Sequence, residues 1–347
     1  MVETPAARRA PGGIKTPRLV TAQVPATLGD YLAARPWKQE DGKSEGRGIM
    51  ATKALRIRVM DEGDLALGMR LKGLAGWNQT EGDWRRFLAL SPDGCFVAER
   101  SIADCLNSEN DVERMAREAV GTAVACVFGP IGWIAMVLVD PAHRGQGIGT
   151  RLVERAIDYL EHCGVRSIRL DATPLGRPVY RKLGFQPEYE LARWEGMAPD
   201  RRPEGLARRA EESQLEAIAR LDQQWTGTPR RRLLEHLFRQ QPGAMHVVEG
   251  PDGLLGYATW REGACARFVG PAVAAVEDAG RWLVDAMLAA CVGRRVFVDI
   301  PWDNPAATRW AQDRGFAVQR PLTRMVRGEP VADRPDRLWA SSGPENG

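Results

Sequence analysis

Hydrophobic and polar positions along the chain form an ordered series of short patterns. The series begins with alternating residues, typical of a strand, and continues with two stretches whose apolar residues recur at helical spacing after acidic residues. Three strand-like runs follow, two of them joined by the turn "GPIG". We expect strands at 54–60, 95–100, 119–128 and 133–139, and helices within 61–76 and 77–94.

A loop with three alternate glycines, "RGQGIG" at 144–149, separates the last of these strands from an amphipathic stretch. The apolar residues of that stretch fall on one helical face, and Gly164 ends the helix. A strand over 166–171, a short helix over 177–183 and a strand over 184–194 complete the first pattern. The apolar face is formed by Leu152, Val153, Ala156, Ile157 and Leu160.

The second half of the sequence repeats this plan. Arg324 follows the Phe of "GF" at 315–316 by eight residues, as Arg193 follows the Phe of "GF" at 184–185. Asp171 and Asp299 each close a strand upstream of such a pair. We therefore predict a duplicated α/β unit of about 150 residues, a size typical of one domain. The expected boundary is the Pro-rich stretch 196–205, and the expected later elements are strands at 244–250, 254–260, 264–270 and 294–300 with a helix around 279–291.

Composition narrows the class of protein. Hydrophobic residues make up 44% of the 347 and charged residues 27%, with a net charge of only +3. No run approaches the ~18 apolar residues of a membrane helix, and no single-sign charge block dominates. Six cysteines are scattered without a CxxC pair. We expect neither a membrane nor a nucleic-acid partner, no metal site, and a reducing, cytoplasmic location.

The first fifty residues differ from the rest. They contain scattered Pro and Gly, mixed charges and no sustained period, which predicts a disordered extension at 1–50. No secretion signal is visible in them. Met50 directly precedes the first predicted strand, and a second hypothesis is that translation begins there.

Glycines between a strand end and a helix start favour an anion, because free backbone N–H groups and the helix dipole meet there. A P-loop requires Lys and Ser or Thr after its glycines, which Thr150-Arg151 does not supply. A dinucleotide fold requires GxGxxG in the first βα turn, whereas this loop has GxGxG after hairpin-linked strands. The pyrophosphate of coenzyme A is the third candidate, and a tight turn without a ligand is the alternative.

The loop after "VLVDP", followed later by "YRKLGF", resembles the GCN5-related N-acetyltransferase (GNAT) superfamily. Residues 144–149 satisfy that family's phosphate signature, Q/R-x-x-G-x-G/A, and the similarity extends in order over about 55–194. The resemblance implies an α/β fold with a mixed sheet. We expect two tandem acyl-CoA N-acyltransferase-like domains, a GNAT domain at 51–198 and a degenerate one at 199–347.

The resemblance also implies roles for the loop and the strand before it. Backbone N–H groups of the loop would bind the pyrophosphate of acetyl-CoA, the expected co-substrate. The strand would splay from its neighbour and pair with the pantetheine arm, and one of its N–H groups would polarise the thioester carbonyl. The residues concerned are Val137, Leu138, Val139, Arg144, Gly145, Gln146, Gly147, Ile148, Gly149 and Thr150.

Two residues are candidates for proton transfer. The resemblance places Tyr180 where the family's general acid stands, and a hydroxyl suits protonation of the departing CoA thiolate. The alternative is that Tyr180 only packs. The strand 133–139 carries no ionisable residue, so Asp171, at the end of the next strand, is the best substitute for a base. Asp171 could instead cap the following turn, and water could take the proton.

The acceptor pocket of this fold lies between the first two helices and the strand ends. The stretch "GWNQTEGDW" falls there, so Trp77 and Trp84 could stack a substrate. Its polar groups would contact Asn78, Gln79, Glu81 and Asp83. The alternative is that the two tryptophans belong to the core and that the polar residues form a loop and a helix cap.

The second half lacks the residues of the loop. Its counterpart, "GPAVAAVEDAG", has no Arg and no GxG, and Glu277 and Asp278 near the helix start would repel phosphate. Ala311 stands at the position of Tyr180. We predict one acetyl-CoA site per chain, in the first half. The clusters at 201–202, 208–209 and 230–232 are expected to be solvated arginines.

These features predict an acetyl-CoA-dependent N-acetyltransferase that acts by direct transfer. The expected acceptor is a primary amine of a small molecule or amino acid, or a protein amino group, and the expected assembly is a monomer or homodimer. One alternative is a non-catalytic CoA-binding sensor or interaction protein. A dinucleotide-dependent oxidoreductase is the other alternative.

Overall fold

The computed structural model describes residues 55–101 and 117–347, all within one compact unit, Ala51–Gly347. The expected disorder of residues 1–50 and the second start at Met50 concern residues outside those described. No helix among the described residues is both long and apolar enough to cross a bilayer.

The first half follows the predicted order of elements. Thr80 begins the second helix through a capping box in which its hydroxyl and the Asp83 carboxylate bind each other's backbone N–H groups. The elements are β1 Leu55–Val59, α2 Leu65–Leu74, α3 Glu81–Leu90, β2 Cys95–Ser101, β3 Arg117–Phe128, β4 Ile131–Val139, α4 Ile148–His162, β5 Ser167–Ala172, α5 Arg177–Lys182 and β6 Gln186–Met197.

The second half repeats the order, so the expected α/β fold with a mixed sheet and two tandem units is confirmed. Helices α6, α7 and α9 and strands β7, β12 and β13 were not predicted from the sequence. The elements are β7 Arg208–Arg209, α6 Leu215–Thr226, α7 Arg231–Gln240, β8 His246–Gly250, β9 Gly253–Arg261, β10 Arg267–Ala274, α8 Glu277–Ala289, β11 Arg295–Pro301, α9 Pro305–Asp313, β12 Ala317–Gly328 and β13 Leu338–Ala340.

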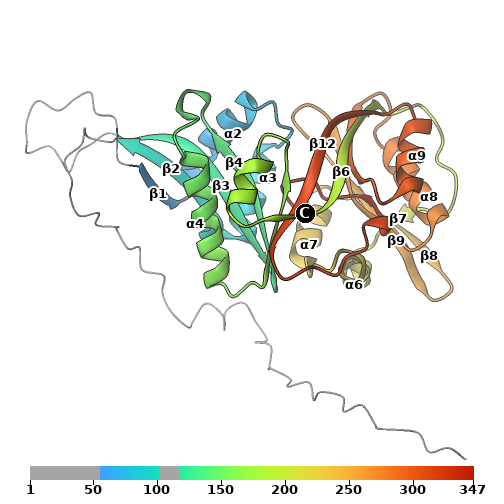
Figure 1. Ribbon diagram of the computed structural model, residues 1–347. Coiled ribbons are helices and arrows are strands. Elements are labelled where there is room, and N and C mark those ends of the chain that lie inside the picture. Colours follow the sequence, from blue (N-terminus) through green and yellow to red (C-terminus); the bar gives the residue numbers. More distant parts are fainter. Residues whose placement is uncertain (1–54, 102–116) are drawn as a thin grey trace, which may run out of the picture. The chain divides into compact units, whose positions relative to one another are not determined.

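The two halves share one continuous sheet because each half gives its last long strand to the other. The order is β1-β2-β3-β4-β5-β12-β6-β11-β10-β9-β8-β7, with β13 paired to β10. Thus β12 pairs with β5 of the first half, and β6 pairs with β11 of the second half. Strands β6 and β12 cross the middle of the molecule side by side (Figure 1).

The exchange is symmetrical at the level of single residues. Between β6 and β12, Tyr189 lies opposite Arg324 and Arg193 lies opposite Arg320. Arg193 and Arg324 each stand eight residues after the Phe of their own GF pair. The register of β6 and β12 therefore relates the two halves by a local two-fold axis. The duplication that the GF spacing predicts is therefore visible in the strand pairing.

Two buried ion pairs fasten this exchange. Arg193 donates to both carboxylate oxygens of Asp299 at 2.8 Å, and Arg324 donates to those of Asp171 at 2.8 and 2.9 Å. All four side chains are at most 4% exposed. Each pair joins an Arg of one half to an Asp of the other, so neither half contains both members of either pair.

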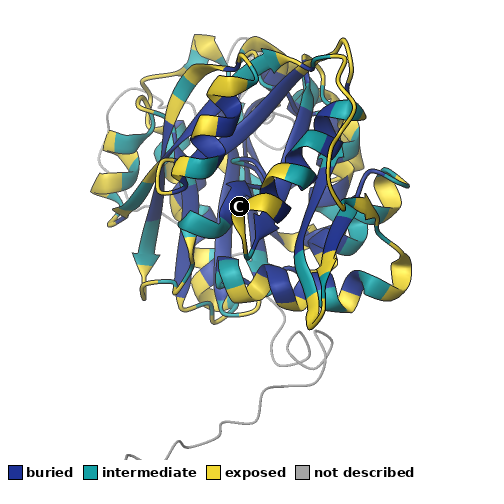
Figure 2. Ribbon diagram, turned by 90° about the vertical axis from the view of Figure 1, so that its right-hand side faces the viewer, coloured by how far each residue is buried: buried dark blue, intermediate teal, exposed yellow. Residues whose placement is uncertain are grey.

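Helices cover both faces of the sheet. Helices α4, α5, α8 and α9 pack on one face, which we call the α4 face, and α2, α3, α6 and α7 pack on the other, which we call the α2 face. The strands between them are largely buried, whereas the outer sides of the helices are exposed (Figure 2). Helix α7 joins the halves: Leu233 and Leu237 pack in the first-half core and Leu234 in the second-half core.

Candidate functional site

The glycine loop lies between β4 and the start of α4, as predicted. Gly145 and Gly147 have φ angles of 75° and 77°, in the left-handed region that glycine adopts without steric cost. A Cβ at either position would meet no atom within 4 Å, so packing does not require these glycines. Gly147 is the N-cap of α4 and no side chain caps that helix end. The helix therefore begins at an exposed loop whose N–H groups are available to an anion.

Two guanidinium groups stand beside the loop. The Arg144 Nε atom donates to the Val139 carbonyl at 3.1 Å, and an Arg100 Nη1 atom donates to the Gln146 side chain at 2.6 Å. Arg144 is exposed. Cationic groups at an open helix start favour a multiply charged phosphate ligand.

The parallel strands β4 and β5 are paired at one end only. Their pairs run from Ile131 opposite Ser167 to Trp133 opposite Arg169, whereas both strands continue beyond these residues. The strands therefore separate toward the glycine loop. Residues 137–139, which the resemblance assigns to the splayed strand, lie in this unpaired part of β4.

A β-bulge sits in the same part of β4. Between the pairs Val124–Ala135 and Thr122–Leu138, two residues of β4 face one of β3. Met136, in the bulge, has a φ of 51°, which is uncommon for a non-glycine residue. The Thr122 hydroxyl donates to its carbonyl at 3.0 Å. The bulge turns the backbone of β4 at the edge of the gap.

Tyr180 lies on α5, on the α4 face beside the separated strands. Its ring packs edge-on against Phe185, with centroids 6.0 Å apart. Within the described residues its hydroxyl has no hydrogen-bond partner. Burial raises the pKa of Tyr180 to about 12. The phenol thus keeps its proton at neutral pH, as a general acid must.

These features fit an acyl-CoA. The open left-handed glycines and the uncapped start of α4 leave space and donors for a pyrophosphate. The gap between β4 and β5 leaves an unpaired strand edge for an extended, amide-containing arm. Gly145 to Thr150 would hold the former and Val137 to Val139 the latter.

The Asp171 carboxylate, the expected base, is held in an ion pair. Both carboxylate oxygens of Asp171 are bound by Arg324, and the Asp171 side chain is 0% exposed. Arg324 thus engages both oxygens, and the carboxylate would have to leave this ion pair before it could take a proton, which argues against a role as general base. The turn-capping alternative is wrong, because the Thr173 hydroxyl, not Asp171, accepts from the Gly176 N–H at 3.2 Å.

The predicted aromatic substrate contacts need correction. Trp84 is 0% exposed and packs edge-on against Phe87, with centroids 6.0 Å apart. It is a core residue and does not stack a substrate. Trp77 is half-buried and packs against the same core.

Asn78 and Gln79 are buried and bind the second half. The side-chain carbonyl oxygen of Asn78 accepts from the backbone N–H groups of Cys265 and Ala266 at 2.9 and 3.0 Å. The Gln79 amide donates to Glu345 at 2.9 Å. Both side chains therefore tie the link between α2 and α3 to the other half in this conformation.

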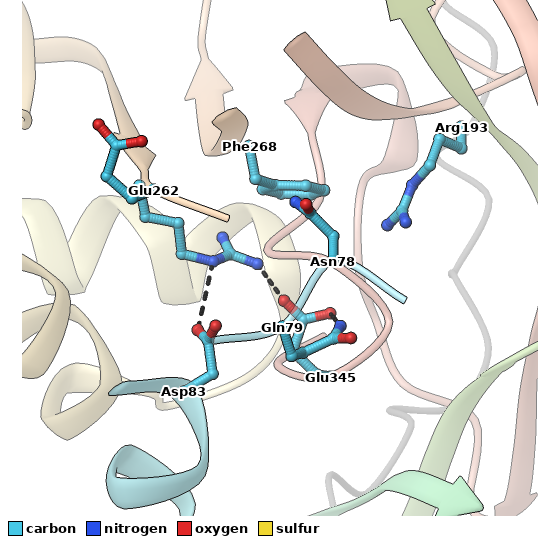
Figure 3. A pocket seen from close by; sticks show the side chains of 8 residues that line it. Asn78, Gln79, Asp83, Arg193, Glu262, Phe268 and Glu345 are labelled. Carbon is cyan, nitrogen blue, oxygen red and sulfur yellow. Dashed lines mark hydrogen bonds and ion pairs between the residues drawn. The ribbon is translucent and has the colours of Figure 1, made fainter. Parts of the chain in front are cut away.

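These contacts surround a small polar pocket between the halves that is partly open to solvent. The Arg261 guanidinium forms ion pairs with both Asp83 and Glu345. Figure 3 shows these two carboxylates at the pocket. Burial raises the pKa of Asp83, but Arg86 and Arg261 outweigh it, so the pKa lies below its usual value. The lining residues are Asn78, Gln79, Asp83, Arg193, Arg261, Glu262, Phe268 and Glu345.

Sequence reasoning missed the residues that the second half contributes. Arg230 was expected on a solvated surface, but it is 3% exposed and forms a two-bond ion pair with Asp222 at 2.8 and 2.9 Å. The Tyr257 hydroxyl also donates to Asp222, at 2.6 Å. The other arginines of the three clusters are exposed, as predicted. An isolated Asp in the apolar face of α6 was the available signal.

In the second half a strand fills the corresponding gap. Strands β10 and β11 pair only from Arg267 opposite Val296 to Val269 opposite Val298. Beyond these pairs β13 runs antiparallel to β10. A Cβ at Gly280 of α8 would lie 1.9 Å from Trp339 of β13, so the glycine permits this close packing.

Comparisons with known proteins agree with this geometry. The family model described as "Acetyltransferase (GNAT) family" matches residues 75–185, and that described as "Acetyltransferase (GNAT) domain" matches residues 218–340. Each model thus matches one half.

Two curated relatives are informative. The chain is 25% identical over 278 residues to the holothin acyltransferase of Pseudoalteromonas sp. (strain SANK 73390), an alignment that covers 78% of this chain and 87% of that protein. It is 26% identical over 144 residues to the glucosamine 6-phosphate N-acetyltransferase of Trypanosoma brucei brucei, which covers 38% of this chain and 89% of that protein.

Solved structures show the same fold. A protein of Pyrococcus horikoshii described as a candidate acetyltransferase superposes with a TM-score of 0.69 at 21% identity, covering 89% of this chain and 100% of that one. A tandem GNAT protein from the clavulanic acid biosynthesis pathway superposes with a TM-score of 0.54 at 12% identity, covering 81% of this chain and 100% of that one. With a family model on each half and tandem neighbours of one fold, the chain belongs to the GNAT family of acyl-CoA-dependent acyltransferases and carries two GNAT domains in tandem.

Proposed function

We propose that the first half transfers an acetyl group from acetyl-CoA to a primary amine of a small molecule or amino acid. Transfer is direct, within a ternary complex of protein, acyl donor and acceptor. The observation that carries this proposal is the glycine loop at the uncapped start of α4, beside the gap between β4 and β5. The names of the relatives support N-acetyl transfer as the reaction type.

The roles of the residues follow from their places. N–H groups of Gly145 to Thr150 bind the pyrophosphate, and the edge of β4 at Val137 to Val139 positions the thioester. An N–H of that edge polarises the carbonyl as charge develops on its oxygen. The amine nitrogen forms a bond to the carbonyl carbon while the carbon–sulfur bond breaks. Tyr180 gives its proton to the departing thiolate.

Solvent removes the proton from the amine. This assignment is supported by two features of the site. Strand β4 has no ionisable side chain, and the Asp171 carboxylate is bound by Arg324. A cysteine-linked intermediate is not invoked, since Cys95, Cys126 and Cys291 are buried and burial raises the pKa of each thiol.

Thiol release from acetyl-CoA over a panel of amines tests the proposal. The panel includes glucosamine 6-phosphate, holothin, free amino acids and a lysine peptide. The account expects release that depends on at least one amine and produces the N-acetyl product by mass spectrometry. Binding of acetyl-CoA without release by any amine would favour a CoA-binding sensor instead.

A further inference from the structure

Residues 341–347 run from β13 into the interior, on the α2 face of the shared sheet. Ser341 and Ser342 are 0% exposed, Glu345 is 3% and Asn346 is 2% exposed. The label C, which marks the C-terminal end, falls in the middle of the molecule in two perpendicular views (Figures 1 and 2). A polar segment rich in glycine and serine is thus buried where surface loops of this composition are usually solvated.

The segment is held against β4 of the first half. The Trp133 indole N–H donates to the Pro344 carbonyl at 3.0 Å, and Gln79 donates to Glu345 at 2.9 Å. A Cβ at Gly347 would lie 2.9 Å from the Trp133 ring, so the Gly347 backbone packs directly on the indole. The Arg324 guanidinium carbon also lies 4.8 Å from the centroid of the Trp133 ring.

The second half holds the segment through two buried arginines. Arg261 donates to the Ser342 carbonyl at 3.0 Å and also binds the Glu345 carboxylate. Arg230, fixed by its ion pair with Asp222, donates to the Gly347 carbonyl. Three side-chain donors thus bind the carbonyls of Ser342, Pro344 and Gly347, and the segment turns back so that the Gly343 carbonyl accepts from the N–H groups of Asn346 and Gly347. We call the space that these donors line the groove, and it holds a short, turned polar segment.

The groove lies where an acceptor must enter. The glycine loop and Tyr180 approach the gap between β4 and β5 from the α4 face, and these parts would hold the donor. An amine must then reach the thioester from the α2 face. Trp133, the last residue of β4 that pairs with β5, lies on that face and is covered by residues 344–347.

We propose that residues 341–347 occupy the space of the acceptor and withdraw before transfer. This inference rests on the proposed function of the first half. When the segment withdraws, it releases the Trp133 indole, the Gln79 amide and the Arg261 guanidinium. These donors favour an amine that also carries carbonyl or carboxylate oxygens, such as an amino acid or a short peptide.

The test measures access to a bound thioester with hydroxylamine, an amine that reacts without a general base. Its nitrogen bonds to the acetyl carbon, the carbon–sulfur bond breaks, and one proton passes to the thiolate through solvent, giving acetohydroxamate and CoA thiol. Three forms are compared with the full chain: a chain ending at Ala340, Glu345→Gln, and the control Glu329→Gln. Glu329 forms an exposed ion pair with Arg166, at 3.6 Å, outside the groove.

The proposal expects an unchanged Kd for acetyl-CoA in all forms. It expects acetohydroxamate formation to rise about tenfold in Glu345→Gln, which loses a charge-assisted contact, and further in the shortened chain. Glu329→Gln stays at the rate of the full chain. The peptide Ser-Ser-Gly-Pro-Glu-Asn-Gly, added to the shortened chain, lowers the rate in competition with hydroxylamine, and a scrambled peptide does not.

Unchanged or lower rates in a folded Glu345→Gln that binds acetyl-CoA would overturn the proposal, whether or not the shortened chain folds. If no form binds acetyl-CoA, the proposed function fails instead. The two failures are therefore separated by the binding measurement.

Discussion

The two halves of this protein have the same fold and differ at one place, the gap between two parallel strands. In the first half β4 and β5 separate beside a glycine loop that leaves the start of α4 uncapped. In the second half β13 enters the gap, and α8 begins with Glu277 and Asp278. Duplication has kept the sheet in both halves, but only the first retains the features that fit an acyl-CoA.

The centre of the sheet shows the opposite situation, because there the halves are alike. Asp171 with Arg324 and Asp299 with Arg193 form equivalent ion pairs across the exchanged strands. Only the first half retains the features that fit an acyl-CoA. An ion pair that is present in both halves is therefore best explained by a structural role. The following changes test the comparison, from the largest expected effect to the smallest.

Tyr180→Phe is expected to lower kcat by about 10²- to 10⁴-fold, because the departing thiolate loses its proton donor. The Kd for acetyl-CoA should not change. Tyr159→Phe is the control, since that hydroxyl, on α4, lies 3.3 Å from the Ser91 hydroxyl. A fall in kcat of less than twofold would assign Tyr180 to packing alone.

The pH dependence gives a second measure of Tyr180. Burial raises its pKa to about 12, above the value of about 10 in an unfolded chain. The folded protein therefore binds this proton more tightly. Its contribution to stability is complete below the unfolded pKa and is lost as the pH rises through the folded pKa. Because Tyr180 keeps its proton in this range, the transfer rate of the native protein should not fall between pH 7 and 9 through ionisation of Tyr180. A fall in this range that is absent from Tyr180→Phe would contradict this expectation.

Asp171→Asn and Asp299→Asn should each lower the free energy of unfolding by about 3–5 kcal/mol, because each leaves a buried Arg without its partner. Urea denaturation followed by circular dichroism measures both. Glu204→Gln, in an exposed pair with Arg201 at 3.4 Å, should cost no more than about 1 kcal/mol. A stable Asp171→Asn that has lost transfer activity would restore Asp171 as the base.

Gly147→Ala should weaken acetyl-CoA binding by at least about tenfold, or about 1.4 kcal/mol. Its new Cβ projects where the ligand approaches the loop. Gly315→Ala is the matched control, with a φ of 76° against 77° and no atom within 4 Å of its Cβ. Both variants carry similar strain of about 1–2 kcal/mol. Equal loss of affinity in both would remove the special role of the loop.

Glu277→Gln with Asp278→Asn tests whether charge alone silences the second half. These residues lie in the first turn of α8, so each change should lower stability by about 0.3–1 kcal/mol. The double variant should gain no acetyl-CoA site, because β13 still fills the gap. A second binding event in calorimetry would show that charge, and not the strand, excludes the ligand.

The sequence predicted the fold and the loop because their signals are local. The glycine spacing of 144–149 and the apolar face of the next helix lie within twenty consecutive residues. The GF pairs also identified Asp171, Arg193, Asp299 and Arg324. Their pairing across the halves could not be predicted, because nothing local distinguishes an Arg that binds its own half from one that binds the other.

The acceptor side was predicted poorly for the same reason. Trp84 and Asn78 stand in an unusual local composition, but contacts distant in sequence decide that one is core and the other binds Cys265 and Ala266. The burial of residues 341–347 was not predicted from the sequence. Their burial depends on Arg230 and Arg261, which lie far away in the sequence.

Titration calorimetry of acetyl-CoA into the full chain tests the division between the halves most directly. The account predicts one binding site per chain, with affinity that falls in Gly147→Ala and is unchanged in Gly315→Ala. Two equivalent sites per chain, or a single site that Gly147→Ala leaves intact, would contradict it.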